Sequence, residues 1–192
     1  MEAFRLETWH LADQTVSSKG QKSCALTADH KTVSFQLGTA LRTRFGATSF
    51  DKGVDAPRRS LDFEITDDDM LARLREIDIW AIAYIAEHSE RLMKKKLSPS
   101  EVENNYKPLV HVYGSSSGVK TKINLRGPRA ATFWDEAGTQ LKEPPGDDAW
   151  QENAYNVYCK LPQVYQMSGS FGWVLETVAL QLCPHVDTCP FG

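Results

Sequence analysis

The chain has 192 residues, of which 41% are hydrophobic and 24% are charged. This length fits one domain over residues 1–192, and the composition excludes wholesale disorder. No apolar run approaches the roughly 20 residues that span a bilayer, and the first residues lack the apolar stretch of a secretory signal. We therefore expect a single-domain intracellular protein, nuclear or cytoplasmic, with no membrane partner.

Four cysteines, Cys24, Cys159, Cys183 and Cys189, are too few for a disulfide scaffold, so reduced thiols are expected. Five residues separate the last two, prolines interrupt the segment, and no second close pair exists, so a zinc site there is the minor alternative to a plain tail. The histidines lie apart, and the chain contains no phosphate loop, dinucleotide fingerprint or nucleophile elbow. We expect no metal, no cofactor and no catalysis.

The formal net charge of −3 argues against nucleic-acid binding, but the charge is unevenly distributed. Residues 1–60 carry nine basic and six acidic groups, and residues 107–142 carry six basic and two acidic groups. The other segments are acidic. The position of the basic segments in the fold therefore matters more than the total, although ordinary fluctuation of surface charge explains the pattern equally well.

In chain order, the first predicted elements are strands. Loose alternation over 4–11 is followed by clean alternation over 32–37, with three apolar side chains on one face. Gly38 interrupts the pattern and alternation resumes over 41–45, so 32–37 and 41–45 are expected to form a hairpin. A further alternating strand covers 61–65.

Two helices follow, at about 67–95 and 99–106. Thr66 is expected to cap the first helix, with the acidic run Asp67 to Asp69 in its first turn, and apolar residues recur at helical spacing from Met70. This explanation is preferred to a metal site for the acidic run. Lys94 to Lys96 is likewise a solvated helix end in preference to a phosphate or targeting patch. Ser98, Pro99 and Glu101 form a capping pattern for the second helix.

Strands resume after the helices. Alternating or β-branched segments cover 109–113, 119–125, 132–134 and 154–166, and a final segment covers 171–182. A short irregular tail, 183–192, ends the chain. Strands that flank a helical insert at about 67–106 predict a β-rich α+β domain built on a barrel or a sandwich.

Two of these strands carry a cationic face opposite an apolar one. Around 41–45, arginines alternate with Leu41 and Phe45, which are expected to be buried. In 119–126, the cations lie opposite Val119, Ile123 and Leu125. The expected phosphate contacts are Arg42, Arg44, Lys120, Lys122 and Arg126. The same side chains also fit ordinary solvent faces of antiparallel sheets.

Single-stranded nucleic acid is held by a cationic groove together with aromatic rings on which bases stack. The nearest rings in the sequence are Tyr113, Trp134, Tyr158 and Trp173, of which one or two are expected to be exposed. We select Trp134 and Tyr158 as the stacking rings.

The order of several segments resembles the phage-type single-stranded-DNA-binding proteins carried by large DNA viruses of eukaryotes. The resemblance spans roughly residues 40–182 and is strongest in 56–65, 74–78, 87–110 and 167–174. It implies an oligonucleotide-binding-fold barrel with a helical insert, acting in replication, repair or recombination. Relatives of this type often end in an acidic tail that closes with an aromatic residue. Here the tail has one acid and a penultimate Phe191, which speaks against a partner-recruiting tail.

The functional prediction is sequence-tolerant binding of single-stranded DNA without catalysis. Replication proteins and a second copy of the chain are the other partners considered. The alternatives are a structural or protein-interaction module, such as a virion component, and an enzyme with dispersed catalytic residues.

Overall fold

The computed structural model describes residues 4–49 and 57–184. Within these ranges most strands join one large mixed sheet, and the helices lie between β5 and β6 or just before β11. The strands are β1 (Trp9–Leu11), β2 (Thr15–Val16), β3 (Lys22–Ala28), β4 (Val33–Arg42), β5 (Arg58–Ile65), β6 (Tyr106–Lys107), β7 (Val110–Tyr113), β8 (Ser116–Asn124), β9 (Thr132–Trp134), β10 (Gln140–Leu141), β11 (Ala154–Met167) and β12 (Ser170–Leu182). The helices are α1 (Asp68–Glu87), α2 (Ser89–Met93), α3 (Pro99–Asn105) and α4 (Ala149–Glu152), with a 3₁₀ turn at Leu6–Thr8.

Five strands close a barrel. β4 pairs antiparallel with β11, β11 with β12, and β5 with β8, while β8 runs parallel to β12. Isolated bridges between Thr43 and Phe63 and between Thr48 and Ser60 bring the end of β4 back to β5. The circuit β4–β5–β8–β12–β11, in which β8 and β12 form the one parallel pair, is the oligonucleotide-binding arrangement. The predicted fold class, a β-rich α+β barrel with a helical insert, is confirmed.

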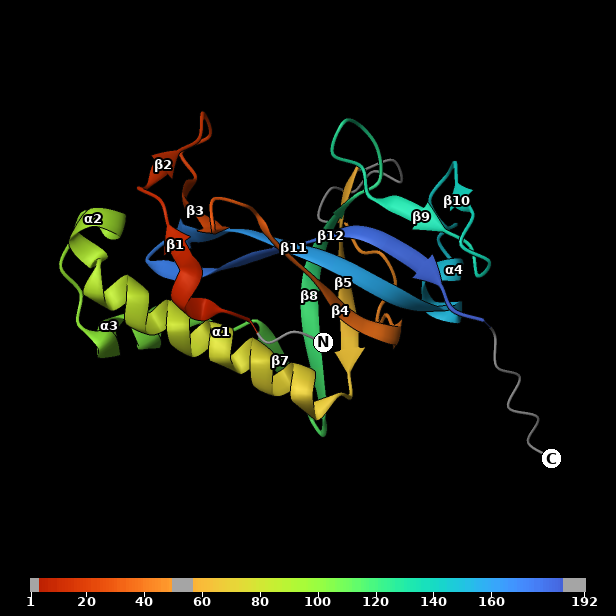
Figure 1. The fold of residues 1–192 in the computed structure, drawn as a ribbon, viewed down its shortest axis with the longest axis horizontal. Helices are drawn as coiled ribbons and strands as arrows, with labels where there is room; N and C mark the ends of the chain where they lie inside the picture. Colours follow the sequence, from red (N-terminus) through yellow and green to blue (C-terminus); the bar gives the residue numbers. More distant parts are fainter. Residues whose placement is uncertain (1–3, 50–56, 185–192) are drawn as a thin grey trace.

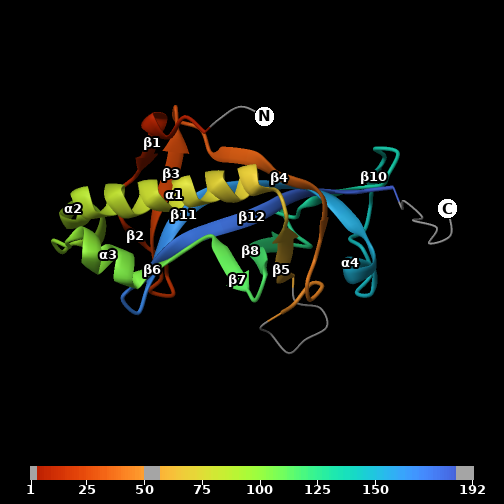
Figure 2. The ribbon, with the colours of Figure 1, turned by 90° about the horizontal axis from the view of Figure 1, so that it is seen from below.

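The long β11–β12 hairpin organises the whole molecule. Figure 1 shows it running from the helices α1 to α3 at one end to β9, β10 and α4 at the other. Figure 2 shows α1 lying along the half of the hairpin that contains its tip. β3 and β4 extend the sheet on the outer edge of β11, while β6, β8 and β9 pair with β12.

The helical insert begins and ends as its capping residues dictate. The Asp67 carboxylate accepts hydrogen bonds from the backbone N–H groups of Asp69 and Met70, so Asp67 caps α1, and the prediction that Thr66 does so is wrong. The predicted capping box of α3 is confirmed, with Ser98 and Glu101 bonded reciprocally. The first predicted helix divides at His88 into α1 and α2.

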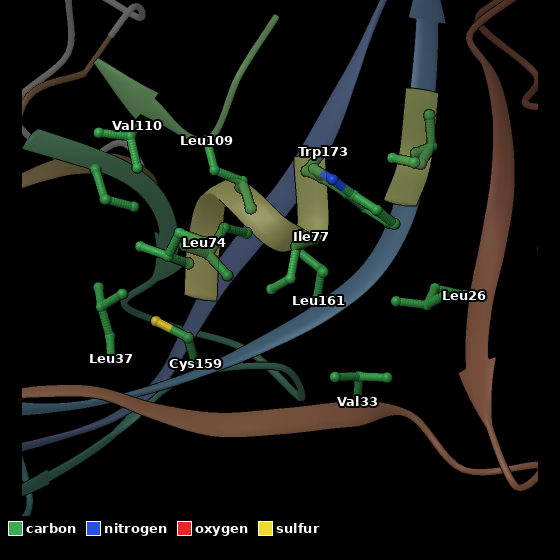
Figure 3. Close-up of a cluster of buried hydrophobic side chains, with 14 of the residues drawn as sticks. Leu26, Val33, Leu37, Leu74, Ile77, Leu109, Val110, Cys159, Leu161 and Trp173 are labelled. Carbon is green, nitrogen blue, oxygen red and sulfur yellow. The ribbon is translucent and has the colours of Figure 1, made fainter. Parts of the chain in front are cut away.

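The main apolar core lies between α1 and the inner side of the barrel (Figure 3). Leu74 and Ile77 of α1 are fully buried and point toward side chains of the barrel strands, including Leu161 and Trp173. The alternation of β11 and β12 places their inward side chains in this core. The opposite, outward side chains of the same strands therefore form the outer surface of the barrel.

The predicted hairpin of 32–37 with 41–45 is wrong. Residues 33–42 form one strand, β4, which pairs with β11 from Val33 to Arg42. Gly38 lies where the register of this pairing shifts, so the glycine marks an irregularity inside a long strand and not a turn. Because β4 ends at Arg42, the alternation does not reach Phe45, whose side chain is 55% exposed and not buried as expected.

In the part of the chain that the structure describes, no helix has the length and apolarity needed to cross a membrane. Most of the predicted tail, 185–192, including Cys189 and Phe191, lies outside the described residues.

Candidate nucleic-acid interface

The outer side of β8 carries two of the predicted cations. Val119 and Ile123 are fully buried and Thr121 nearly so, whereas Lys120 is exposed and Lys122 is half-buried. The Lys122 ammonium donates a hydrogen bond to the Ser60 hydroxyl of β5 at 2.6 Å. Partial burial lowers the pKa of Lys122, and the nearby positive charges of Arg58 and Lys120 lower it further. The alternation predicted for this strand is thus confirmed, and its cations lie close together.

A glutamate of β12 links this pair to cations on two further strands. Glu176 lies opposite Lys122 in the parallel register of β12 with β8 and opposite Lys160 in the register of β12 with β11. Its carboxylate accepts from Lys160 at 3.0 Å and from Arg58 at 3.4 Å. We call Arg58, Lys120, Lys122 and Lys160 the outer cationic row. The row crosses β5, β8, β12 and β11 on one side of the barrel.

The two predicted rings meet in one hollow beside this row. Trp134 lies opposite Gln181 in the register of β9 with β12, and Tyr158 lies opposite Ala179 in the register of β11 with β12. The hollow is open, has a volume of about 270 Å³, and is lined by these four side chains and Gly138. We call it the aromatic hollow. Tyr158 is 41% exposed and Trp134 is half-buried, so both rings are accessible from solvent.

Strand order explains why the hollow and the row share one surface. Tyr158 and Lys160 are two residues apart on β11, and the inward side chains of Val157, Cys159 and Leu161 are fully buried. Side chains two apart on a strand point to the same face. The Tyr158 ring and the Lys160 ammonium therefore project from the same face of one strand, so the aromatic hollow lies next to the outer cationic row.

The two predicted arginines of the β4 region occupy different environments. Arg42 is exposed and lies opposite Ala154 at the start of β11. Arg44 is largely covered: its guanidinium donates to the Ser116 hydroxyl at 2.8 Å and lies 4.5 Å above the centre of the Tyr113 ring. Glu64 is 3.8 Å away. These contacts fix Arg44 against the β7–β8 hairpin.

The other predicted residues are placed as follows. Arg126 lies just beyond the end of β8, is exposed, and is therefore not oriented by the alternation of that strand. Tyr113 donates from its hydroxyl to Asp62 at 2.9 Å and sits beneath Arg44. Trp173 is 8% exposed and packs near Trp80 of α1. Neither of these two rings forms part of the aromatic hollow.

Three residues of this surface were not predicted from the sequence: Arg58, Lys160 and Glu176. Arg58 stands at the first position of β5, just before the segment predicted as a strand, so the same alternation would have placed it outside. Lys160 is the one basic residue of residues 143–192, and it belongs to an alternating segment. The ion pairs between strands depend on the register of β12, for which the sequence offered no signal.

Comparisons with known proteins give alignments with solved structures over most of the chain, at low sequence identity. No family model matches the sequence, and no curated protein matches it. Among solved structures, the single-stranded DNA-binding protein from bacteriophage Enc34 in complex with ssDNA aligns with a TM-score of 0.48 and 12% identity, covering 95% of this chain and 96% of that chain. A second structure, of the single-stranded DNA-binding protein from bacteriophage Enc34, aligns with a TM-score of 0.45 and 11% identity, covering 90% of this chain and 89% of that chain. The resemblance to the proteins carried by large DNA viruses of eukaryotes stays a prediction.

Proposed function

We propose that this chain binds single-stranded DNA, with little sequence preference, along the outer cationic row and the aromatic hollow, in replication, repair or recombination. The observation that carries the proposal is the presence of both features on one outer surface. Cations neutralise the phosphates of a single strand, and aromatic rings stack with its bases. Each feature alone is common on protein surfaces, whereas their side-by-side position fits a flexible strand with unpaired bases.

The place of the row within the barrel supports the proposal. β5 and β8 are the second and third strands of the barrel circuit, and the face of these two strands is where oligonucleotide-binding barrels hold their ligands. Arg58 belongs to the first, and Lys120 and Lys122 to the second. The three cations therefore occupy the surface on which this fold is expected to bind a chain of phosphates.

The seven residues selected from the sequence enter this proposal with different roles. Lys120 and Lys122 belong to the row, and Trp134 and Tyr158 to the hollow. We assign Arg42 and Arg126 to phosphate contacts at the margins of the surface, where both are exposed. Arg44 is assigned a positioning role, because Ser116, Glu64 and Tyr113 surround its guanidinium.

The first experiment is a fluorescence-anisotropy titration of labelled oligo-dT and of a duplex of equal length, from low to moderate salt. We expect oligo-dT to bind more tightly than the duplex, because unpaired bases reach the hollow. Equally weak binding to both would favour the rival class, a structural or protein-interaction module.

The second experiment removes Lys120 and Lys122 together by substitution with alanine. Each phosphate contact on a single strand contributes about 0.7 to the slope of log affinity against log salt, so the slope should fall by about 1.4. The control replaces Arg75 and Lys95, two exposed cations of the helical insert, and should leave the slope unchanged. Lys120→Gln, at an exposed position, repeats the test with little risk to folding. An unchanged slope in folded variants would show that β8 does not contact the phosphates.

A further inference from the structure

The outer side of the β11–β12 hairpin repeats one arrangement at two places. Tyr158 of β11 lies opposite Ala179 of β12, and Tyr165 of β11 lies opposite Gly172 of β12. The two tyrosines are seven residues apart, as are their two small partners. An irregularity after Tyr158 and a second one after Lys160 keep the side chains in phase. Both tyrosines thus face outward, each beside a position with little or no side chain.

The contact between Tyr165 and Gly172 is close. A Cβ atom added to Gly172 would lie 2.8 Å from both Cε1 and Oη of Tyr165, which is nearer than a Cβ atom approaches a non-bonded carbon or oxygen atom. A glycine inside a strand often marks a point where another group approaches the backbone. Gly172 is buried beneath the ring, whereas Tyr165 itself is half-buried. The ring therefore lies across β12 and leaves part of its surface to solvent.

The side of the sheet that holds Tyr165 is opposite the core. Phe171 and Trp173, the neighbours of Gly172, are buried, and Trp173 packs near Trp80 of α1. Val164, the neighbour of Tyr165, is also buried. By alternation, Gly172 and Tyr165 face the other way, onto the same outer surface as Lys160 and Tyr158.

Cations accompany this second tyrosine. Lys107 of β6 is exposed and lies opposite Gly172 in the parallel register of β6 with β12. Lys160 lies between the two tyrosines on β11. The outer surface therefore continues from the aromatic hollow, past Lys160, to a second combination of ring and cations.

The geometry points to a second base-stacking site at Tyr165 over Gly172, with Lys107 as its phosphate contact. The same DNA strand would bind the aromatic hollow with one end and this second site with the other. The inference rests on the proposed function and extends it to the tip half of the hairpin. Seven residues of a strand span about 23 Å, at roughly 3.3 Å per residue. At about 3.4 Å per stacked nucleotide, a single strand needs about seven nucleotides to reach both tyrosines, and an extended strand needs fewer.

The experiment compares Tyr165→Ala with the wild-type chain on two lengths of oligo-dT, about 4 and about 12 nucleotides, both within the range of site sizes of such barrels. Loss of one stacked base costs about 1–3 kcal/mol, so affinity for the longer oligonucleotide should fall about 5- to 150-fold. Affinity for the short one should change little, because the aromatic hollow still binds it. Tyr158→Ala is the matched control and should weaken both lengths.

Two further variants separate stacking from folding. Tyr165→Phe keeps the ring and should bind both lengths as the wild type does. Gly172→Ala keeps the ring but displaces it, and should reproduce the length-dependent loss. Equal affinity of folded Tyr165→Ala and wild type for the longer oligonucleotide would overturn the second site and leave the proposed function intact. Failure of the wild type to bind either length would instead reject the proposed function.

Discussion

At the scale of single residues, Glu176 is an acid within a cationic surface. It is 15% exposed and holds the side chains of Arg58 and Lys160 at 3.4 and 3.0 Å. In this position the carboxylate orders two cations but also competes with any phosphate that approaches them. The net effect on DNA affinity depends on which role is stronger. We expect competition to be stronger, because the Arg58 side chain is 54% exposed and can reach a phosphate when the carboxylate does not hold it.

We therefore expect Glu176→Gln to bind oligo-dT more tightly than the wild type. Arg58 and Lys160 already contact phosphates in the proposed complex, so the gain is in affinity, and the salt slope, about 0.7 for each phosphate contact on a single strand, should change little. Anisotropy titrations across a salt series measure both quantities. Glu90→Gln, at an exposed position of α2, is the matched control and should change neither. Weaker binding by folded Glu176→Gln would show that ordering of Arg58 and Lys160 matters more than competition.

Asp78 of α1 is a second residue whose environment is unusual. Burial raises the pKa of its carboxyl to about 6, although hydrogen bonds from the Tyr106 hydroxyl at 2.7 Å and from the Leu109 N–H at 2.9 Å oppose the rise. These bonds tie α1 to the segment that leads from α3 into β7. The ionised group is retained at neutral pH at some cost in stability.

The pH dependence follows from this pKa. Because the folded state binds the proton more tightly than the unfolded state, the stabilisation is fully present below about pH 4 and is lost as the pH rises through 6. Between pH 7 and pH 5 the free energy of unfolding should gain about 1 kcal/mol from Asp78. Urea denaturation at the two pH values should show this gain in the wild type and not in Asp78→Asn. Glu103→Gln, an exposed acid-to-amide change in α3, is the control. The same gain in both variants would assign it to another group.

At the scale of elements, the sequence predicts what depends on neighbouring residues. Ser98 and Glu101 are three residues apart, and the capping box they form needs nothing from the rest of the chain. Likewise, the alternation of Val119 to Ile123 identifies an amphipathic strand whatever its partners are. Local capping and periodicity therefore located the insert and the cations of β8.

Features that depend on long-range pairing were not predictable in the same way. Gly38 is a residue type that favours turns, but the pairing of β4 with β11 continues on both sides of it, so the chain stays extended. In the sequence, Trp134 and Tyr158 are only aromatic residues near the cationic strands. Their meeting in one hollow depends on the pairing of β12 with both β9 and β11. The cluster of Arg58, Lys160 and Glu176 joins three strands, so its prediction required the register of each pair.

At the scale of the whole molecule, the β11–β12 hairpin separates two functions. Its inward side chains complete the core with α1 (Figure 3), and its outward side chains form the proposed DNA surface. Helices α1 to α3 pack on the inner side, so they contribute stability without occupying the row or the hollow. This division explains how a chain with a net charge of −3 can present a cationic surface.

Two adjacent residues of β11 test this division. Leu161 is fully buried, so Leu161→Ala should lower the free energy of unfolding by about 2–5 kcal/mol. Lys160 belongs to the outer cationic row, so Lys160→Ala should lower the salt slope for oligo-dT by about 0.7 and change stability little. Urea denaturation and anisotropy, measured on both variants where each is fully folded, give the two quantities. The division predicts that Leu161→Ala binds oligo-dT as the wild type does. A comparable loss of affinity in both variants would show that binding depends on the packing of the whole hairpin and not on its outer side chains.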